Sequence, residues 1–318
     1  MEEIVRALNA ARTITLVSHV KPDGDAVGSL LGLSLALQSM GKKTTAVLSD
    51  GVPAVFSYLK NSASVATRLL ADADLCVLLD AGSGSRTGFP EVIDQYIKKG
   101  ALIIIDHHPK AELAKTVPNY LHKVDASSAS ELVFELLQHL GVKLTGALCT
   151  CLLTGLYTDT GGFQFSNTTP HCLEVAAELL RRGANLQSIT GALAADRSLI
   201  SLKLLGIALE RARACGGGTI TYLLHKDFQR LNASDEELYG IVNQLHDLPG
   251  SHFALLLTEH DKGVIRGNLR GGEWGIDVSA LARLFCGGGH VKAAGFSFPG
   301  QLVETNGWVC VEELAPVG

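Results

Sequence analysis

The chain has 318 residues, a mass of 33.6 kDa and a formal net charge of −5 at pH 7. With 47% hydrophobic and only 19% charged residues it can bury a sizeable core, which excludes disorder as its main state. The acidic balance excludes a strongly basic nucleic-acid coat, so any contact with nucleic acid must be local. The length predicts two domains, and 34 glycines with 6% aromatic residues favour an α/β protein over a β-sandwich.

The N-terminus, the apolar runs and the cysteines indicate where the protein resides. Met1 is not followed by a basic region and an apolar one, so no signal peptide is predicted. The longest apolar runs, at 75–79 and 102–105, are far shorter than the roughly 20 residues of a membrane span. Seven cysteines at scattered positions argue against a disulfide scaffold. We therefore expect a cytoplasmic protein with no membrane contact.

Strands and helices alternate in the first half of the chain. Buried strands are predicted at 13–18, 43–49, 75–80 and 101–106. The main helices between and after them are predicted at 26–40, 130–140, 144–159 and 170–182. Strands that alternate with helices favour a parallel sheet covered on both faces. Residues 1–187 are therefore predicted to form one α/β domain.

The pattern changes after residue 187. Residues 188–215 form a long, partly charged helical stretch that ends before three glycines, and we interpret it as a helical linker. The rest of the chain, 216–318, has short predicted strands and helices without the regular alternation. It is predicted to be a second, smaller α+β domain.

Acidic and histidine side chains fall at the ends of the predicted elements. They come from four segments, which contribute His19, Asp23 and Asp25; Asp80; Asp106, His107 and His108; and Asp159. In an open parallel sheet ligands bind at the carboxyl ends of the strands, so three of these segments are expected to meet at one edge. A single aspartate there is often only a helix cap or a loop residue, but four such segments together are hard to explain in that way.

Clustered carboxylates need a compensating charge. Carboxylates about 5 Å apart repel each other by roughly 1 kcal/mol or more per pair. A divalent ion removes that cost, and carboxylate with imidazole ligands suits Mn²⁺, Mg²⁺ or Fe²⁺ better than structural Zn²⁺. Two such ions about 3.5–4 Å apart, bridged by a carboxylate and a water, form a phosphoester-cleaving site.

Five segments resemble the motifs of one known family, in the order in which that family has them. They are 19–29 (HVKPDGDAVGS), 79–81 (LDA), 105–109 (IDHHP), 157–162 (YTDTGG) and 287–295 (GGGHVKAAG). The family is that of the DHH phosphoesterases with a DHH-associated C-terminal domain. The chain is most similar to the branch of bifunctional oligoribonucleases (nano-RNases) and phosphatases of 3′-phosphoadenosine 5′-phosphate (pAp).

The resemblance implies two Mn²⁺ ions, with Mg²⁺, Co²⁺ or Fe²⁺ as alternatives. The implied ligands are His19, Asp23 and Asp80 for one ion, and Asp25, Asp80, His107 and Asp159 for the other, with Asp80 as the bridge. His108 would face the substrate phosphate. Asp106 would orient an imidazole, as carboxylates beside ligating histidines do.

The resemblance also implies that the second domain binds substrate, with the active site in the cleft between the two domains. Arg270 would lie on the strand that faces the glycine loop, and a guanidinium suits bidentate phosphate binding. The residues Gly288, Gly289 and His290 would approach a phosphate, since glycines let backbone N–H groups come close. The nearby charges Arg266 and Lys292 are interpreted as solvated surface groups.

The implied reaction is hydrolysis of short oligoribonucleotides and dinucleotides to mononucleotides and of pAp to AMP. A phosphodiesterase for linear or cyclic dinucleotides shares the metal site and is the second hypothesis. A non-catalytic nucleotide-binding regulator would require a broken ligand set, whereas all six proposed ligands are present. The sequence leaves the oligomeric state open, with a homodimer among the options.

Overall fold

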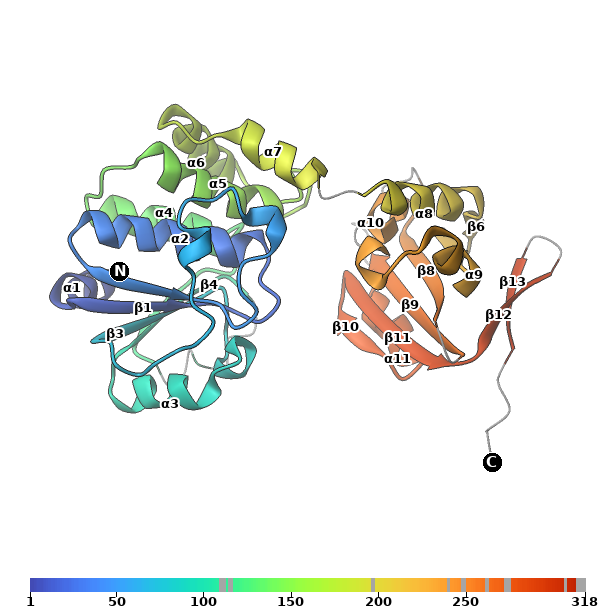
Figure 1. Ribbon diagram of the computed structural model, residues 1–318, viewed down its shortest axis with the longest axis horizontal. Coiled ribbons are helices and arrows are strands. Elements are labelled where there is room, and N and C mark those ends of the chain that lie inside the picture. The colour runs from blue at the N-terminus through green and yellow to red at the C-terminus, as the bar shows by residue number, and fades with distance from the viewer. Residues whose placement is uncertain are drawn as a thin grey trace. The chain divides into compact units, whose positions relative to one another are not determined.

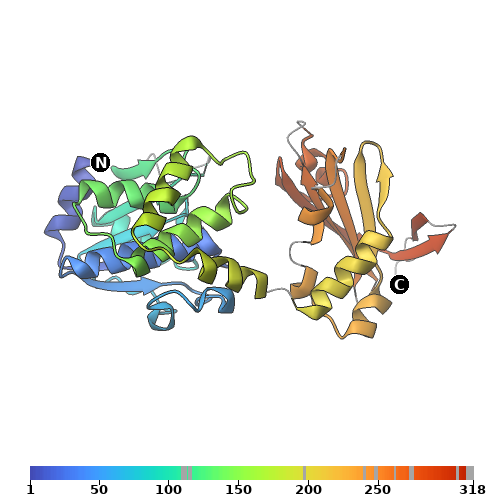
Figure 2. The same cartoon turned by 90° about the horizontal axis from the view of Figure 1, so that it is seen from above.

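The computed structural model describes residues 1–108, 113, 117–195, 198–238, 241–246, 250–260, 263–271, 276–305 and 308–312. The chain divides into two compact units, Met1–Asp196 and Arg197–Gly318. Each unit has its own sheet (Figures 1 and 2). Within the described part of the chain, no helix combines the length and the hydropathy that a membrane crossing requires.

The first unit is built on a five-stranded sheet in the order β2-β1-β3-β4-β5. Its strands are β1 (Thr13–Val17), β2 (Lys43–Val47), β3 (Leu75–Leu79), β4 (Leu102–Asp106) and β5 (Asn119–His122). All four pairings are parallel, which confirms the predicted sheet type. The sequence did not predict β5, whose four residues are only partly apolar.

Helices cover both faces of this sheet (Figure 1). Alternate strand residues pack under the helices of one face and of the other. The helices are α1 (Glu2–Ala10), α2 (Gly24–Ser39), α3 (Pro90–Lys98), α4 (Ala129–His139), α5 (Gly146–Asp159), α6 (Pro170–Arg181) and α7 (Leu186–Ala195), with 3₁₀ turns η1 (Ala54–Phe56), η2 (Ser62–Ser64) and η3 (Gly84–Thr87). Val77 and Ile103 face the core under α2, α4 and α5. Leu78 and Ile104 face the core under α3. Burial on both faces explains the uninterrupted apolar sequences of β3 and β4.

Helices α2 and α5 approach each other closely because glycines lie at their contact. A Cβ atom on Gly28 would overlap the carbonyl oxygen of Cys151. A Cβ atom on Gly155 would overlap Oδ1 of Asp25. Close-packed interiors cannot absorb such overlaps without a shift of backbone or side chain. The two glycines therefore allow Asp25, in the first turn of α2, to lie against α5, the helix that ends at Asp159.

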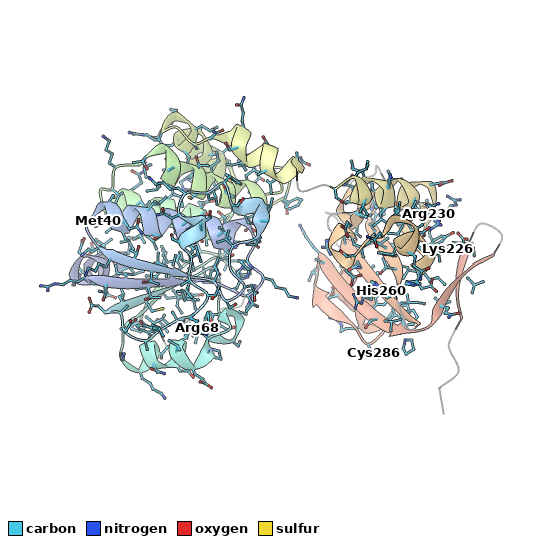
Figure 3. The ribbon with its side chains drawn as sticks, in the orientation of Figure 1. Met40, Arg68, Lys226, Arg230, His260 and Cys286 are labelled. Carbon is cyan, nitrogen blue, oxygen red and sulfur yellow. The ribbon has the colours of Figure 1, made fainter. Side chains whose placement is uncertain are left out.

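The second unit contains a six-stranded mixed sheet in the order β10-β11-β9-β8-β7-β6. Its strands are β6 (Arg213–Cys215), β7 (Gly218–Leu223), β8 (Phe253–His260), β9 (Val264–Gly271), β10 (Gly288–His290) and β11 (Ala293–Pro299), while β12 (Gln301–Thr305) and β13 (Trp308–Glu312) form a separate pair. The helices are α8 (Leu199–Glu210), α9 (His225–Leu231), α10 (Ile241–His246) and α11 (Val278–Arg283), with the 3₁₀ turn η5 (Asp235–Leu238). Side chains fill the space between this sheet and its helices (Figure 3). The smaller α+β unit matches the prediction.

The stretch interpreted as a linker, 188–215, is shared between the two units. Helix α7 belongs to the first unit, where Ile189 joins the core. Helix α8 belongs to the second unit, where Leu204 and Ala208 are buried. The stretch is thus two helices and the strand β6 instead of one helix. The uniform helical pattern of the sequence hides this division, and the boundaries 1–187, 188–215 and 216–318 remain a proposal.

Candidate metal centre

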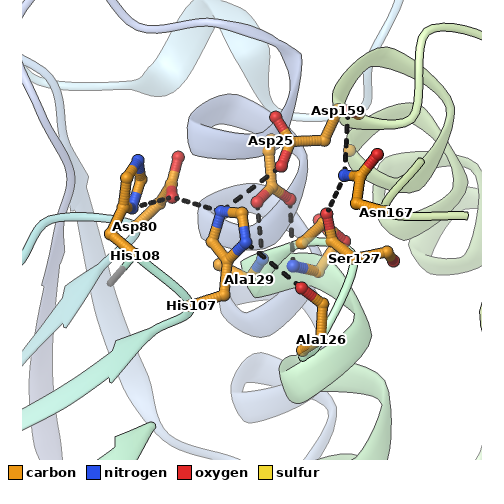
Figure 4. Close-up of polar contacts among 12 residues, drawn as sticks. Asp25, Asp80, His107, His108, Ala126, Ser127, Ala129, Asp159 and Asn167 are labelled. Atoms are coloured by element: carbon orange, nitrogen blue, oxygen red, sulfur yellow. Dashed lines mark hydrogen bonds and ion pairs between the residues drawn. The ribbon is translucent and has the colours of Figure 1, made fainter. Parts of the chain in front are cut away.

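The six predicted metal ligands and His108 gather at the carboxyl edge of the first sheet. Three groups of side chains there have potential ligand atoms within 4.8 Å of one another, namely His19, Asp23 and Asp80; Asp80, His107 and His108; and Asp25, His107 and Asp159. Asp80 and His107 each belong to two groups, so the three groups form one continuous cluster. Figure 4 shows Asp80, His107, Asp25 and Asp159 in this arrangement.

Asp80 follows β3 directly and lies at the centre of the cluster. Its Oδ2 lies 3.3 Å from Nε2 of His19, and its Oδ1 lies 3.4 Å from Nε2 of His107. The residue is buried, and its φ of 54° lies in the left-handed region. Such a conformation costs about 1–3 kcal/mol and persists where the surroundings enforce it, often at functional sites.

The two aspartates of the first motif have different surroundings. Asp23 is the N-cap of α2, and its Oδ1 accepts hydrogen bonds of 3.0 Å from the backbone N–H groups of Asp25 and Ala26. Asp25 is fully buried, and its two carboxylate oxygens accept from Ala129 N at 2.6 Å and Ser130 N at 2.9 Å. These donors are the first N–H groups of α4, where the helix dipole favours a negative charge.

The Asp-His-His segment at the end of β4 orients both imidazoles. Oδ1 of Asp106 accepts from the backbone N–H of His107 at 3.0 Å and from Nδ1 of His108 at 2.8 Å. Nδ1 of His107 donates to the carbonyl oxygen of Ala126 at 3.3 Å. The Nε2 atoms of both rings are therefore left for other partners, and Nε2 of His107 lies 3.3 Å from Oδ2 of Asp159. The contact between Asp106 and His108 is the kind that the expected orienting role of Asp106 requires.

The predicted substrate-binding residues lie in the second unit. Arg270 lies on β9 opposite Ala293 of β11, and β11 pairs with β10, which begins at Gly288. A Cβ atom on Gly289 would overlap the backbone around Ala293, whereas one on Gly288 would meet open space. Packing therefore requires a glycine at position 289. At Gly288 packing sets no such requirement, and the space beside it is open. The side chain of His290 lies outside the described residues.

The two charges interpreted as surface groups are exposed. Arg266 is on the same strand as Arg270, and its Nη1 lies 2.5 Å from Oδ2 of Asp235. Lys292 lies in the turn between β10 and β11. The exposure of both residues matches their interpretation as surface charges.

Comparison with known proteins identifies the chain. Residues 13–156 match the model of the DHH family N-terminal domain, and residues 216–306 match the DHHA1 domain. A relative from Thermus thermophilus named bifunctional oligoribonuclease and PAP phosphatase NrnA is 35% identical over 305 residues, covering 94% of this chain and 87% of the relative. The chain belongs to the DHH family. This membership confirms the resemblance inferred from the motifs.

Two further members extend the comparison. The protein of the same name from Bacillus subtilis is 28% identical over 93% of this chain and 92% of its own. The crystal structure of an exopolyphosphatase-related protein from Bacteroides fragilis has a TM-score of 0.84 and 26% identity, covering 94% of this chain and 92% of that one. The similarity to these two proteins thus extends along nearly the whole chain.

Sequence analysis missed the residues that hold the ligands of this DHH family member in place. Backbone groups at 126–130 contact Asp25 and His107. The side chain of Asn167 donates to two carbonyl oxygens at the site. The Ser128-to-Glu131 spacing signals a helix start, and Ser128 does accept from Glu131 N at 3.1 Å. Nothing in that signal reveals that the helix N-terminus receives a distant carboxylate.

Strand β5 also supports the Asp-His-His segment. Nε2 of His122 donates to the backbone carbonyl oxygen of His108 at 2.7 Å. The ring of Tyr120 lies 5.1 Å from the ring of His122, centroid to centroid. Burial and the neighbouring Asp106 carboxylate raise the pKa of Tyr120. Since β5 itself was not predicted, these supports could not be found from the sequence.

Without a bound metal ion, the imidazoles of the cluster bind protons strongly. Burial lowers the pKa of His19, but the neighbouring carboxylates of Asp23 and Asp80 outweigh it and raise the pKa to about 10. Burial likewise lowers the pKa of His107, and the Asp80 carboxylate outweighs it and raises the pKa to about 10. Both pKa values are raised for the same reason, which is an excess of negative charge around the rings.

The pKa values of the carboxyl groups also reflect this excess of negative charge. Burial, and then the charge of Asp80, raise the pKa of Asp25 to about 7. Burial, and then the charge of Asp25, raise the pKa of Asp159 to about 9. For Asp80 itself burial raises the pKa, but the flanking imidazoles of His107 and His19 lower it by more, so the pKa is lowered overall. The site thus favours a bound positive charge.

The residues present fit a divalent metal. Oδ1 of Asp80 is buried and accepts no hydrogen bond from the described residues, although Nε2 of His107 and Nδ1 of His108 both lie 3.4 Å away. The described cluster offers carboxylate oxygens and imidazole nitrogens without a thiolate, a donor set typical of Mn²⁺, Mg²⁺ or Fe²⁺. An ion would satisfy the unpaired oxygen and offset the clustered negative charge.

We predict that metal ions stabilise the protein more at alkaline pH. The raised pKa values of Asp25, Asp159, His19 and His107 add stability to the metal-free fold that is fully present below the unfolded values, about 4 for carboxyls and 6.5 for imidazoles. This stability is lost as the pH rises through the folded values of about 7 to about 10. Ions replace these protons, so binding strengthens as the pH rises.

The measurement is the melting temperature with Mn²⁺ and with a chelator at about pH 6 and about pH 8.5. The increase caused by Mn²⁺ should be larger at the higher pH. Asp80→Asn, which weakens the site, serves as the control and should reduce the increase at both pH values. An equal increase at both pH values in the unsubstituted protein would contradict the prediction.

Proposed function

We propose that the protein hydrolyses phosphoester bonds in short oligoribonucleotides and in pAp with the help of two divalent ions, Mn²⁺ first among them. The observation that supports this most directly is the buried Asp80, whose carboxylate lies between the His19–Asp23 group and the His107–His108 group. The two relatives described above, named for oligoribonuclease and PAP phosphatase activities, match over more than nine-tenths of this chain. Site and relatives therefore favour the same reaction class.

The ligand assignment is part of this proposal. His19, Asp23 and Asp80 would hold one ion, and the second would be held by Asp25, Asp80, His107 and Asp159. Bound divalent ions lower the pKa of a water and offset charge on phosphoryl oxygens. In this arrangement Asp80 keeps the two ligand groups together. None of the residues has to act as a covalent nucleophile.

His108 is proposed to act on the substrate. Because its Nδ1 donates to Asp106, its Nε2 is free to face the substrate, and in the imidazolium form that Nε2 can donate a proton to a nonbridging phosphoryl oxygen or to the leaving oxygen. Asp106, fully buried at the end of β4, fixes the orientation of that ring. In the second unit Arg270 and the open Gly288 are proposed to bind the other end of a short nucleotide.

The proposed function is tested by hydrolysis in the presence of Mn²⁺. The panel contains a diribonucleotide, a 20-residue RNA, pAp and a cyclic dinucleotide at equal concentration. We expect the diribonucleotide and pAp to be hydrolysed fastest, because the acidic protein offers no extended basic track for a long strand. Fastest hydrolysis of the cyclic dinucleotide would instead support the second hypothesis, and binding without hydrolysis would support a regulator.

The control for this panel is Asp80→Ala, with Asp94→Ala on the exposed side of α3 as its matched partner. Loss of the shared carboxylate should loosen both ions and abolish hydrolysis, whereas Asp94→Ala should leave it intact. An Asp80→Ala protein with more than about a tenth of the activity would contradict the two-ion assignment, since even indirect metal contacts typically contribute 10–100-fold.

The role of His108 gives a second prediction. His108→Ala should keep its metal content and slow turnover by about 10²–10⁴-fold, the usual range for a general acid or base. The measurements are the metal content of the purified variant and kcat for the diribonucleotide. His139→Ala, an exposed histidine at the end of α4, is the control and should change neither. Loss of one equivalent of metal from His108→Ala would make His108 a ligand.

Arg270 gives a third prediction. Arg270→Ala should raise KM for the diribonucleotide and pAp by about 10–150-fold, the equivalent of about 1.5–3 kcal/mol for a lost charged hydrogen bond. Hydrolysis of bis-p-nitrophenyl phosphate, which has no second nucleotide, should stay nearly unchanged. Arg266→Ala on the same strand is the matched control. If the generic substrate suffered as much as the diribonucleotide, Arg270 would belong to the catalytic centre itself.

A further inference from the structure

The ligand group formed by Asp25, His107 and Asp159 is held by one short segment, residues 126–130, which leads into the first turn of α4. The N–H groups of Ala129 and Ser130 hold the carboxylate of Asp25. This group differs from that of His19, Asp23 and Asp80, in which the hydrogen bonds of His19 and Asp23 lie within their own part of the chain. Asp23 accepts from its own helix, and Nδ1 of His19 lies 2.8 Å from the carbonyl oxygen of Val20.

The same segment orients the second ligand of this group. The carbonyl oxygen of Ala126 lies 3.3 Å from Nδ1 of His107, so that nitrogen carries the proton and donates it. Nε2 is then unprotonated when the ring is neutral, which is the form that binds a metal. The segment thus fixes one ligand through its N–H groups and another through a carbonyl oxygen.

The third ligand, Asp159, is connected to the segment by Asn167. Nδ2 of Asn167 donates to the carbonyl oxygen of Ser127 at 3.0 Å and to the carbonyl oxygen of Asp159 at 3.2 Å. One amide therefore joins the segment before α4 to the last residue of α5, 32 positions apart along the chain (Figure 4). Ser127 is itself fixed, since its backbone N–H donates to Oε2 of Glu131 at 3.0 Å.

The position of Asp159 explains why such a link matters. A carboxylate at the C-terminal end of a helix faces the negative end of the helix dipole, and this one also faces the charge of Asp25. Both effects push the carboxylate away from the position in which it shares an ion with Asp25 and His107. A hydrogen bond to its backbone opposes that displacement without occupying the oxygens that would bind the ion.

We propose that Asn167 is a positioning residue for the ion held by Asp25, His107 and Asp159, and for that ion only. Its two hydrogen bonds go to backbone carbonyl oxygens and not to the ligand atoms of the cluster. It acts by holding the backbone of Asp159 against the segment that already fixes the other two ligands. This inference rests on the two-ion site of the proposed function, but it concerns ion binding and not hydrolysis.

The test is calorimetric titration of the metal-free, full-length protein with Mn²⁺. The unsubstituted protein should bind two ions. Asn167→Ala should bind one ion as before and the other about 10–100-fold more weakly, the usual effect of losing an indirect metal contact. Asn167→Leu keeps the approximate size of the side chain without its N–H groups and should behave alike, so the result does not depend on one variant.

The control is Asn185→Ala, which removes another asparagine-to-backbone hydrogen bond in the same unit, from Ser188 N to Oδ1 at 2.9 Å. Its melting temperature with a chelator present shows what the loss of such a bond does to the fold alone. Asn167→Ala should match it there and differ from it in Mn²⁺ binding.

Two results would overturn the proposal: an Asn167→Ala protein that binds both ions normally, or one that loses both alike. The titration needs no substrate. A failure to hydrolyse short RNA would therefore reject the proposed function while the result for Asn167 still held.

Discussion

Repulsion among the carboxylates of Asp25, Asp80 and Asp159 is the constraint on which the architecture of the first unit depends. The first two are buried, and all three lie in one linked cluster with His107. Burial and, after it, this repulsion raise the pKa values of Asp25 and Asp159, so the metal-free cluster favours protonated carboxyl groups. A divalent ion can replace those protons, so the repulsion that destabilises the metal-free fold favours metal binding.

The fold counters this repulsion with backbone groups and close packing. The N-terminus of α4 offers N–H groups to Asp25, and the glycines at the contact of α2 and α5 leave room for that carboxylate. The left-handed conformation of Asp80 presents its carboxylate to imidazoles from two other strand ends. The left-handed backbone of Asp80 is costly, whereas the N–H groups of α4 stabilise Asp25. Together these features hold the carboxylates and imidazoles close enough to share an ion.

The two units carry different parts of the proposed chemistry. The first unit supplies the ligands and His108, all at element ends where parallel topology brings them together. The second supplies Arg270 and an open glycine on a mixed sheet.

The sequence by itself determined the parallel sheet, the main helices around it and the aspartate and histidine residues that gather at its carboxyl edge. Periodicity and burial act over a few residues and can be read locally, and the topology of parallel strands places their carboxyl ends together. That is why His19, Asp80 and His107 could be named before the structure was known. The motifs then added the division of the ligands between two ions, which stays a proposal.

Only the tertiary structure decided how those ligands are held. The contacts of Asp25 with Ala129 and Ser130 join residues more than 100 positions apart, and they use backbone N–H groups that every such residue possesses. The link through Asn167 and the division of 188–215 between two cores are likewise long-range facts. Local patterns specify elements and side-chain chemistry, whereas these contacts exist only once distant helices have packed together.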